Sequence, residues 1–148
     1  MSERITKNMA RNIYFGGALF AILIFAGLTV DTVQRVPELS NSDKITESVA
    51  NGKHLWEVNN CVGCHTIMGE GAYYAPELAN VFDRRGMKDE AAFKVYLNGW
   101  MAAQPMNEPG RRKMPQFNLS EEQVNNLADF LIWTSRIDDN EWPPNIEG

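Results

Sequence analysis

The chain has 148 residues, of which 44% are hydrophobic and 22% are charged, and this balance excludes an intrinsically disordered chain. Its formal net charge of -5 argues against nucleic-acid binding, which generally uses a basic surface. The two cysteines, Cys61 and Cys64, stand within one pentapeptide, so no disulfide framework is available to support the fold. The fold must therefore rest on a packed core and on whatever these two cysteines bind.

The first predicted element is a membrane anchor over residues 13–30. This apolar run carries no charge, and as a helix it would be about 27 Å long, enough to cross the hydrocarbon core of a bilayer. A cleaved signal peptide would have a shorter apolar run and a small-x-small cleavage site, and a buried core helix of a soluble domain would leave a polar face. The run has none of these features, which favours an uncleaved transmembrane helix.

Basic residues before the anchor predict its orientation. Three of them, against one acidic residue, lie within residues 1–12, so we expect this segment to stay in the cytoplasm. Residues 31–44 are polar and contain Pro37, and they are predicted to be a linker. Residues 45–148 are then a domain in the periplasm, held on the outer face of the inner membrane.

The domain is predicted to be all-α. Apolar residues recur at helical spacing over about 44–59, 89–101 and 121–136. Asp89 is a predicted N-cap, and Ser120 with Gln123 predicts a capping box. No stretch alternates with period two, so no sheet is expected. The side chains expected to face inward are Val49, Gly52, Leu55, Trp56, Ala92, Phe93, Tyr96, Leu97, Trp100, Val124, Leu127, Leu131 and Ile132.

The pentapeptide Cys61-Val62-Gly63-Cys64-His65 has the Cys-x-x-Cys-His pattern of covalent haem attachment. Two thiols separated by two residues can reach the two vinyl groups of one porphyrin from a single turn, and the following imidazole then reaches the iron. The pattern therefore predicts one haem c, attached through Cys61 and Cys64, with His65 as an axial ligand.

The two cysteines have three other interpretations. A thioredoxin-type redox pair expects a βαβ neighbourhood that a helical chain lacks. A structural zinc site needs four ligands, and the adjacent Cys64 and His65 cannot easily reach one metal together, even with His54 and Cys61. A disulfide across two residues would close a strained loop.

A closed coordination shell needs a second axial ligand. Met68 and His54 lie too close to the motif, and they would approach the iron from the side of His65. We favour Met114, which stands before Pro115 in the long loop 104–118, a kind of loop that is usually functional in small domains. A thioether raises the reduction potential and suits an electron carrier. Met87, Met101 and Met106 remain alternative candidates for this ligand, although Met101 is better explained as a side chain that fills the core.

The second ring nitrogen of His65 also needs a partner, because such a hydrogen bond orients the imidazole. The carbonyl of Pro76 is available for it, since no helix has yet begun there. Pro76 could instead be the first residue of a helix, a position at which proline is common.

The domain resembles a class I cytochrome c. The resemblance rests on CVGCH, Pro76, Met114-Pro115 and a Gly52-x-x-x-Trp56 pattern that would face an aromatic such as Phe130. It covers nearly all of residues 45–136 and implies a single-haem helical domain.

A closer similarity is to the cytochrome c subunit of bacterial nitric oxide reductase. It rests on GEGAYYAPEL (69–78), GRRKMPQFNLS (110–120), WPPN (142–145) and the single anchor. The resemblance implies a chain that is not itself catalytic. It would pass electrons from a soluble periplasmic donor, such as a cytochrome c or cupredoxin, to a large polytopic subunit in the respiratory chain of denitrification. In this family the large subunit holds haem b and a haem–non-haem-iron centre and converts two nitric oxide molecules into nitrous oxide.

The same resemblance implies a calcium ion between the subunits, with the Gly71 carbonyl and the Tyr73 side chain among its ligands. From the residues alone, this segment reads equally as a loop covering the haem. The basic run Arg111-Arg112-Lys113, next to Met114, would pair with haem propionates, dock the large subunit or simply be solvated.

Two further functions stay open. The chain would be a free-standing membrane-anchored cytochrome c if it had no permanent partner, or a haem-based gas sensor or small haem enzyme if Met114 were not a stable ligand.

Overall fold

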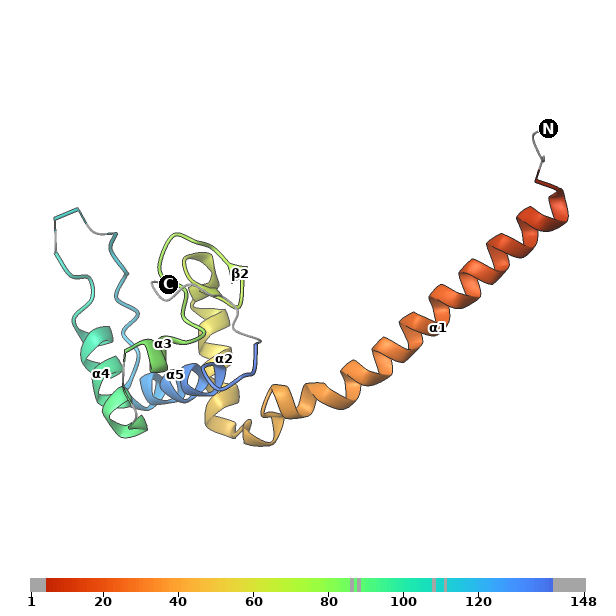
Figure 1. Ribbon diagram of the computed structural model, residues 1–148. Coiled ribbons are helices and arrows are strands. Elements are labelled where there is room, and N and C mark those ends of the chain that lie inside the picture. The colour runs from red at the N-terminus through yellow and green to blue at the C-terminus, as the bar shows by residue number, and fades with distance from the viewer. Residues whose placement is uncertain (1–4, 86, 88, 108, 111, 140–148) are drawn as a thin grey trace. The chain divides into compact units, whose positions relative to one another are not determined.

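The computed structural model describes residues 5–85, 87, 89–107, 109–110 and 112–139 (Figure 1). It has two compact units, Met1–Glu38 and Leu39–Gly148. Helices dominate both units, so the predicted all-α class is confirmed.

Helix α1, Lys7–Leu39, forms most of the first unit and contains the predicted anchor. None of its side chains is buried, and Phe15, Phe20 and Phe25 are each more than 60% exposed. By its length and apolar composition, α1 could cross a membrane. The hydroxyls of Thr29 and Thr32 donate to carbonyls one turn earlier, both at 2.8 Å, so these polar groups are satisfied within the helix. A lipid environment would cover the exposed apolar surface.

The helix extends beyond the apolar run, through 31–39 of the segment expected to be a linker. Arg35 and Asp31, one turn apart, form an ion pair at 3.1 Å that supports this extension. Pro37 lies in the last turn, where its missing N–H removes one hydrogen bond, and the helix ends two residues later.

The second unit holds the remaining elements. Thr46, Asp89 and Ser120 cap three of its helices, and the capping box of Ser120 and Gln123 is present, as predicted. In chain order, the elements are η1 (Ser42–Lys44), α2 (Glu47–Val58), η2 (Cys61–Gly63), β1 (Thr66–Ile67), β2 (Glu70–Gly71), α3 (Val81–Arg84), α4 (Glu90–Ala102) and α5 (Glu121–Thr134).

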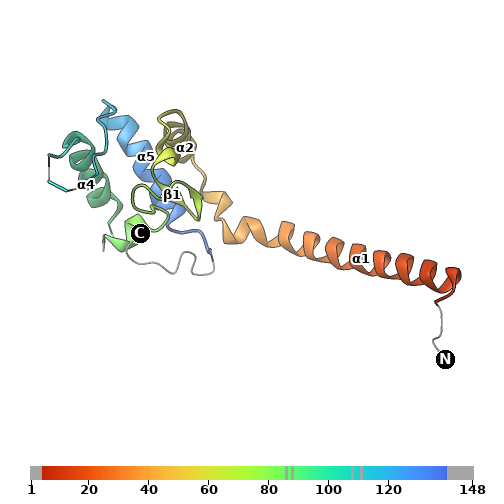
Figure 2. The same ribbon diagram turned by 90° about the horizontal axis from the view of Figure 1, so that it is seen from above.

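The core forms where α5 packs against α2 and α4 (Figure 2). Gly52 allows α2 to lie directly on α5, since a Cβ at this position would come within 2.0 Å of the Asn126 carbonyl oxygen. One turn later, the Trp56 ring lies 6.2 Å from the ring of Phe130, as the Gly52-x-x-x-Trp56 pattern predicted. The buried core residues are Val49, Trp56, Val81, Phe82, Phe93, Leu97, Met101, Val124, Leu127, Ala128, Phe130, Leu131 and Ile132.

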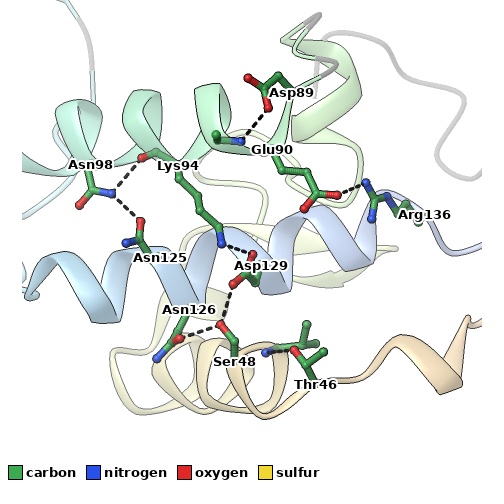
Figure 3. A network of polar contacts seen from close by, with 12 residues as sticks. Thr46, Ser48, Asp89, Glu90, Lys94, Asn98, Asn125, Asn126, Asp129 and Arg136 are labelled. Carbon is green, nitrogen blue, oxygen red and sulfur yellow. Dashed lines mark hydrogen bonds and ion pairs between the residues drawn. The ribbon is translucent and has the colours of Figure 1, made fainter.

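A polar network also joins these three helices (Figure 3). Asp129 on α5 accepts from the Ser48 hydroxyl of α2 at 2.7 Å and forms an ion pair with Lys94 of α4, also at 2.7 Å. Asn98 of α4 donates to Asn125 of α5 at 2.9 Å. One carboxylate therefore fixes the rotation of α5 against both neighbours.

Two further features differ from the expectations. The strands β1 and β2 form a small antiparallel hairpin. Strands of two residues are too short to show the alternation of polar and apolar residues that predicts a strand. Met68 and Gly69 form its turn, with the positive φ angles of 51° and 82° that a two-residue hairpin turn needs. Ala92, expected to face inward, is exposed, because Phe93, Leu97 and Met101 carry the core face of α4 at four-residue spacing.

Candidate functional site

A cavity of about 500 Å³ lies within the second unit, and Cys61, Cys64 and His65 form part of its wall. Its size falls within the range of small-molecule and cofactor sites. The remaining wall comes from α2, the 74–85 segment with α3, α4, the 104–118 loop and α5, and it is largely apolar. Its apolar side chains include Trp56, Phe93, Leu97, Trp100, Leu127 and Leu131.

The pentapeptide forms one tight turn directly after α2. Asn60 adopts a left-handed conformation with φ 53°, which turns the chain after α2 and leads into η2. The N–H groups of Cys64 and His65 both donate to the Cys61 carbonyl, at 3.1 Å and 2.9 Å. A single turn therefore places two thiols and one imidazole on the same wall. Both cysteines are half-buried, and they are not joined in a disulfide.

His65 is oriented by the contact predicted from the sequence. Its Nδ1–H donates to the Pro76 carbonyl at 2.7 Å, which leaves Nε2 as the nitrogen available for a metal. Burial lowers the pKa of His65, and the hydrogen bond to Pro76 offsets this only in part. The imidazole is therefore held neutral, the protonation state in which it binds iron.

The cysteines do not have the character of a reactive dithiol. Burial raises the pKa of Cys61 to about 11, whereas thiol–disulfide enzymes lower the pKa of the attacking cysteine. Within the described residues, no group of three or more His, Cys, Asp or Glu side chains could hold a metal ion. The thioredoxin-type and zinc interpretations therefore lack support in the geometry.

Of the described methionines, three line the cavity: Met101, Met106 and Met114. Met101 belongs to α4 and to the hydrophobic core, where it is 6% exposed. Met106 and Met114 are half-buried in the 104–118 loop. His54 is exposed and lines a separate groove between α2 and α5. The cavity thus contains Met114 without singling it out, and its role as a ligand stays a prediction.

Gln116 holds the Met114 loop against the end of α4. Its Nε2 donates to the carbonyls of Met101 and Gln104, both at 3.1 Å, and its Oε1 accepts from the Asn118 N–H at 3.0 Å. The carbonyls at a helix C-terminus lack partners within the helix, and this amide satisfies them. The loop therefore has a defined path past the cavity.

Basic side chains line the cavity of this acidic chain. Arg112 and Lys113, from the predicted basic run, are among them, while Arg111 and the segment 142–145 lie outside the described residues. Arg84 and Arg85 line it as well, although the sequence motifs did not single them out. Their adjacency within an acidic domain was the signal that could have found them. Four cations thus face a space that is otherwise mostly apolar.

Gly71 and Tyr73, the residues that resemblance associates with calcium, both lie at the surface, and Tyr73 is 73% exposed. Gly71 has an independent structural role. Its φ is +120°, and a Cβ there would come within 2.2 Å of the His65 carbonyl oxygen. The hairpin can pack on the pentapeptide only because this residue is glycine.

The residues present fit a covalent haem. The two thiols come from one turn, and the neutral imidazole has Nε2 available. All three groups line the apolar cavity. The four cations are suited to the two carboxylates that a haem carries.

Comparisons with known proteins agree with this assignment. A family model described as Cytochrome c matches residues 49–135. The C subunit of nitric oxide reductase from Stutzerimonas stutzeri is 62% identical over 148 residues, which cover all of both chains. The proteins of the same name from Paracoccus denitrificans and Halomonas halodenitrificans are 49% identical over 151 residues and 47% identical over 150 residues, again over both full lengths. These matches confirm the resemblance drawn from the motifs.

Proposed function

We propose that this chain, which belongs to the cytochrome c family and within it to the C subunits of nitric oxide reductase, is the electron-transfer subunit of a membrane-bound nitric oxide reductase. The observation that carries the proposal is the turn of Cys61–His65 at the wall of an apolar cavity, with the His65 ring oriented by the Pro76 carbonyl at 2.7 Å. A covalently held haem c supplies one-electron exchange at its iron.

The pentapeptide has two tasks in this proposal. Cys61 and Cys64 would form the thioethers that tether the haem, and His65 would bind the iron through Nε2. The Pro76 carbonyl fixes the ring plane and keeps the proton on Nδ1. The buried Trp56, whose ring centroid lies 6.1 Å from that of His65, packs beside the imidazole and helps to exclude water from it.

Met114 would hold the haem iron as the second protein ligand. It is half-buried, lines the cavity, and follows a path that Gln116 ties to α4. Met114→Ala should keep the haem attached but lower its potential and let carbon monoxide bind the reduced protein. Met106→Ala, from the same loop, is the matched control and should retain the closed shell. Ready carbon monoxide binding by the wild-type protein, or an unchanged spectrum in Met114→Ala, would contradict this ligand.

The apolar part of α1 anchors the chain in the inner membrane. Its basic N-terminal flank, which includes Lys7 and Arg11, supports a cytoplasmic N-terminus and a periplasmic haem domain. Protease added to intact spheroplasts should then release the haem domain, whereas inverted vesicles should protect it.

Electrons would enter from a soluble periplasmic donor, such as a cytochrome c or cupredoxin, and leave to a large polytopic subunit. The large subunit would hold haem b and a haem–non-haem-iron centre and would reduce nitric oxide, so this chain would not be catalytic alone. The deciding experiment is purification in mild detergent from the native membrane. A large haem b subunit should copurify with the chain. A chain that runs alone would instead be a free-standing anchored cytochrome c.

Calcium at the subunit interface belongs to the same proposal and rests on the family resemblance. The Gly71 carbonyl and the exposed Tyr73 side chain offer oxygen atoms, which suit calcium, and the large subunit would complete the site. Calcium analysis of the purified complex, with Tyr73→Phe as the variant, tests it. A calcium-free complex would refute it.

A further inference from the structure

Two loops from opposite walls of the cavity meet at its rim. Arg112 and Tyr74 both line the cavity, and both are exposed at the surface. The guanidinium carbon of Arg112 lies 4.5 Å from the centroid of the Tyr74 ring. The same guanidinium donates from Nη1 to the Tyr74 backbone carbonyl. Arg112 therefore contacts both the ring and the backbone of the opposite loop.

The two residues occupy matching positions beside the groups that hold the iron. Tyr74 precedes Pro76, whose carbonyl orients His65, by two residues. Arg112 precedes Met114 by two residues. The contact between Arg112 and Tyr74 thus connects the segment that supports one axial ligand to the segment that bears the other.

Met114 is held from both sides along the chain. Gln116, two residues after it, binds the end of α4. Arg112, two residues before it, reaches the His65 side of the cavity. Only the second of these anchors bridges the two walls, so its loss would free one end of the Met114 segment while the other end stayed in place.

We propose that Arg112 and Tyr74 form a clasp that positions Met114 and keeps exogenous ligands away from the sixth coordination position of the iron. This inference rests on the proposed ligation by Met114. In a protein whose relatives are named for a reductase of nitric oxide, a diatomic ligand competing for the iron would block electron transfer. The clasp makes opening of the Met114 segment more costly, and so keeps the coordination shell closed.

The expected effect follows from the strength of such contacts. A cation over an aromatic ring at an exposed site shifts an equilibrium by up to about fivefold, which equals about 1 kcal/mol at 1.4 kcal/mol per tenfold change. Removing the clasp should therefore raise the affinity of the ferric haem for added imidazole about fivefold. The sulfur-to-iron charge-transfer absorption of the ferric protein should weaken in parallel.

The test uses the full-length, haem-loaded chain in detergent. Arg112→Gln removes both contacts, Tyr74→Ala removes only the stacking, and Tyr74→Phe keeps the ring. Arg136→Gln is the matched control, since it also removes a surface cation beside an aromatic ring, 5.9 Å from the Phe82 ring centroid, but outside the cavity lining. We expect imidazole affinity to rise most in Arg112→Gln and less in Tyr74→Ala, and to stay near the wild-type value in Tyr74→Phe and Arg136→Gln. The double variant Arg112→Gln/Tyr74→Ala should match Arg112→Gln alone.

Two results would overturn the clasp. One is an imidazole affinity in Arg112→Gln equal to that of the wild-type protein. The other is an equal rise in Arg112→Gln and Arg136→Gln, which would show that the loss of any surface cation has the same effect. Met114→Ala separates this failure from failure of the ligand itself. If Met114→Ala binds imidazole no better than the wild-type protein, the proposed ligation fails; if it binds far better while Arg112→Gln does not, only the clasp fails.

Discussion

Gly52 offers the sharpest test of how the fold supports the haem site. Its α-carbon faces α5, and an added Cβ would lie 2.0 Å from the Asn126 carbonyl oxygen and 2.7 Å from the Phe130 Cβ. Backbone cannot rotate away as a side chain can. Gly52→Ala therefore requires α2 and α5 to separate by roughly 1.4 Å, the gap between 2.0 Å and an ordinary contact at 3.4 Å.

The magnitude follows from two opposing effects. Replacing a helical glycine by alanine gains about 0.5–1 kcal/mol in backbone entropy. Forcing apart the main helix contact of the core costs about 3 kcal/mol, at the upper end of overpacking effects. We expect Gly52→Ala to lower the free energy of unfolding by about 2 kcal/mol. With a urea dependence of about 2 kcal/mol per molar, the midpoint falls by about 1 M.

Gly99→Ala is the matched control, because Gly99 is also helical but has open space where its Cβ would lie. It should raise the midpoint through the entropy gain alone. Urea unfolding of the haem-loaded chain, followed by haem absorption and circular dichroism, measures both variants. If Gly52→Ala matched the wild-type protein or shifted in the same direction as Gly99→Ala, the close packing of α2 on α5 would be refuted.

Three other variants probe the cofactor and the polar contacts. Cys61→Ala combined with Cys64→Ala should abolish haem staining on a denaturing gel and leave mainly the circular dichroism of α1. Without haem, the apolar cavity of about 500 Å³ would have to fill with water or collapse, so the domain should not fold. A variant that kept the full helical signal would contradict this expectation. Ser48→Ala should lower the free energy of unfolding by about 1 kcal/mol through loss of its hydrogen bond to Asp129. Ser120→Ala should lower the free energy of unfolding by about 1 kcal/mol, because it removes the N-terminal cap of α5. Urea unfolding measures both serine variants, and a midpoint equal to that of the wild-type protein would refute the estimate for that variant.

Much of the fold could be predicted because its signals are local. The helical spacing of Val124, Leu127 and Leu131, with the cap at Ser120, is enough to place α5. The partner of His65 could be predicted as well, since a proline before a helix leaves its carbonyl available. In both cases, the residues that decide the structure lie within eleven positions of each other in the sequence.

The features that sequence reasoning missed depend on contacts between distant segments. The arginines at 84 and 85 reach the cavity because α3 packs against α5, which the pattern of either segment alone does not reveal. The hairpin of β1 and β2 depends on Met68 and Gly69 accepting positive φ angles, although methionine is no turn residue by propensity. The choice among Met101, Met106 and Met114 is of the same kind, because all three reach one cavity.

The charges around the cavity act in the same direction as the proposed thioether ligand. The chain as a whole carries a net charge of -5, yet Arg84, Arg85, Arg112 and Lys113 all line the cavity. Reduction removes one positive charge from the iron, so nearby cations favour the reduced state and raise the potential. A thioether does the same by favouring ferrous iron. Arg112 would then act twice, through its charge and through its hold on the Met114 segment. Its removal should lower the potential more than removal of Arg85, which acts through charge alone.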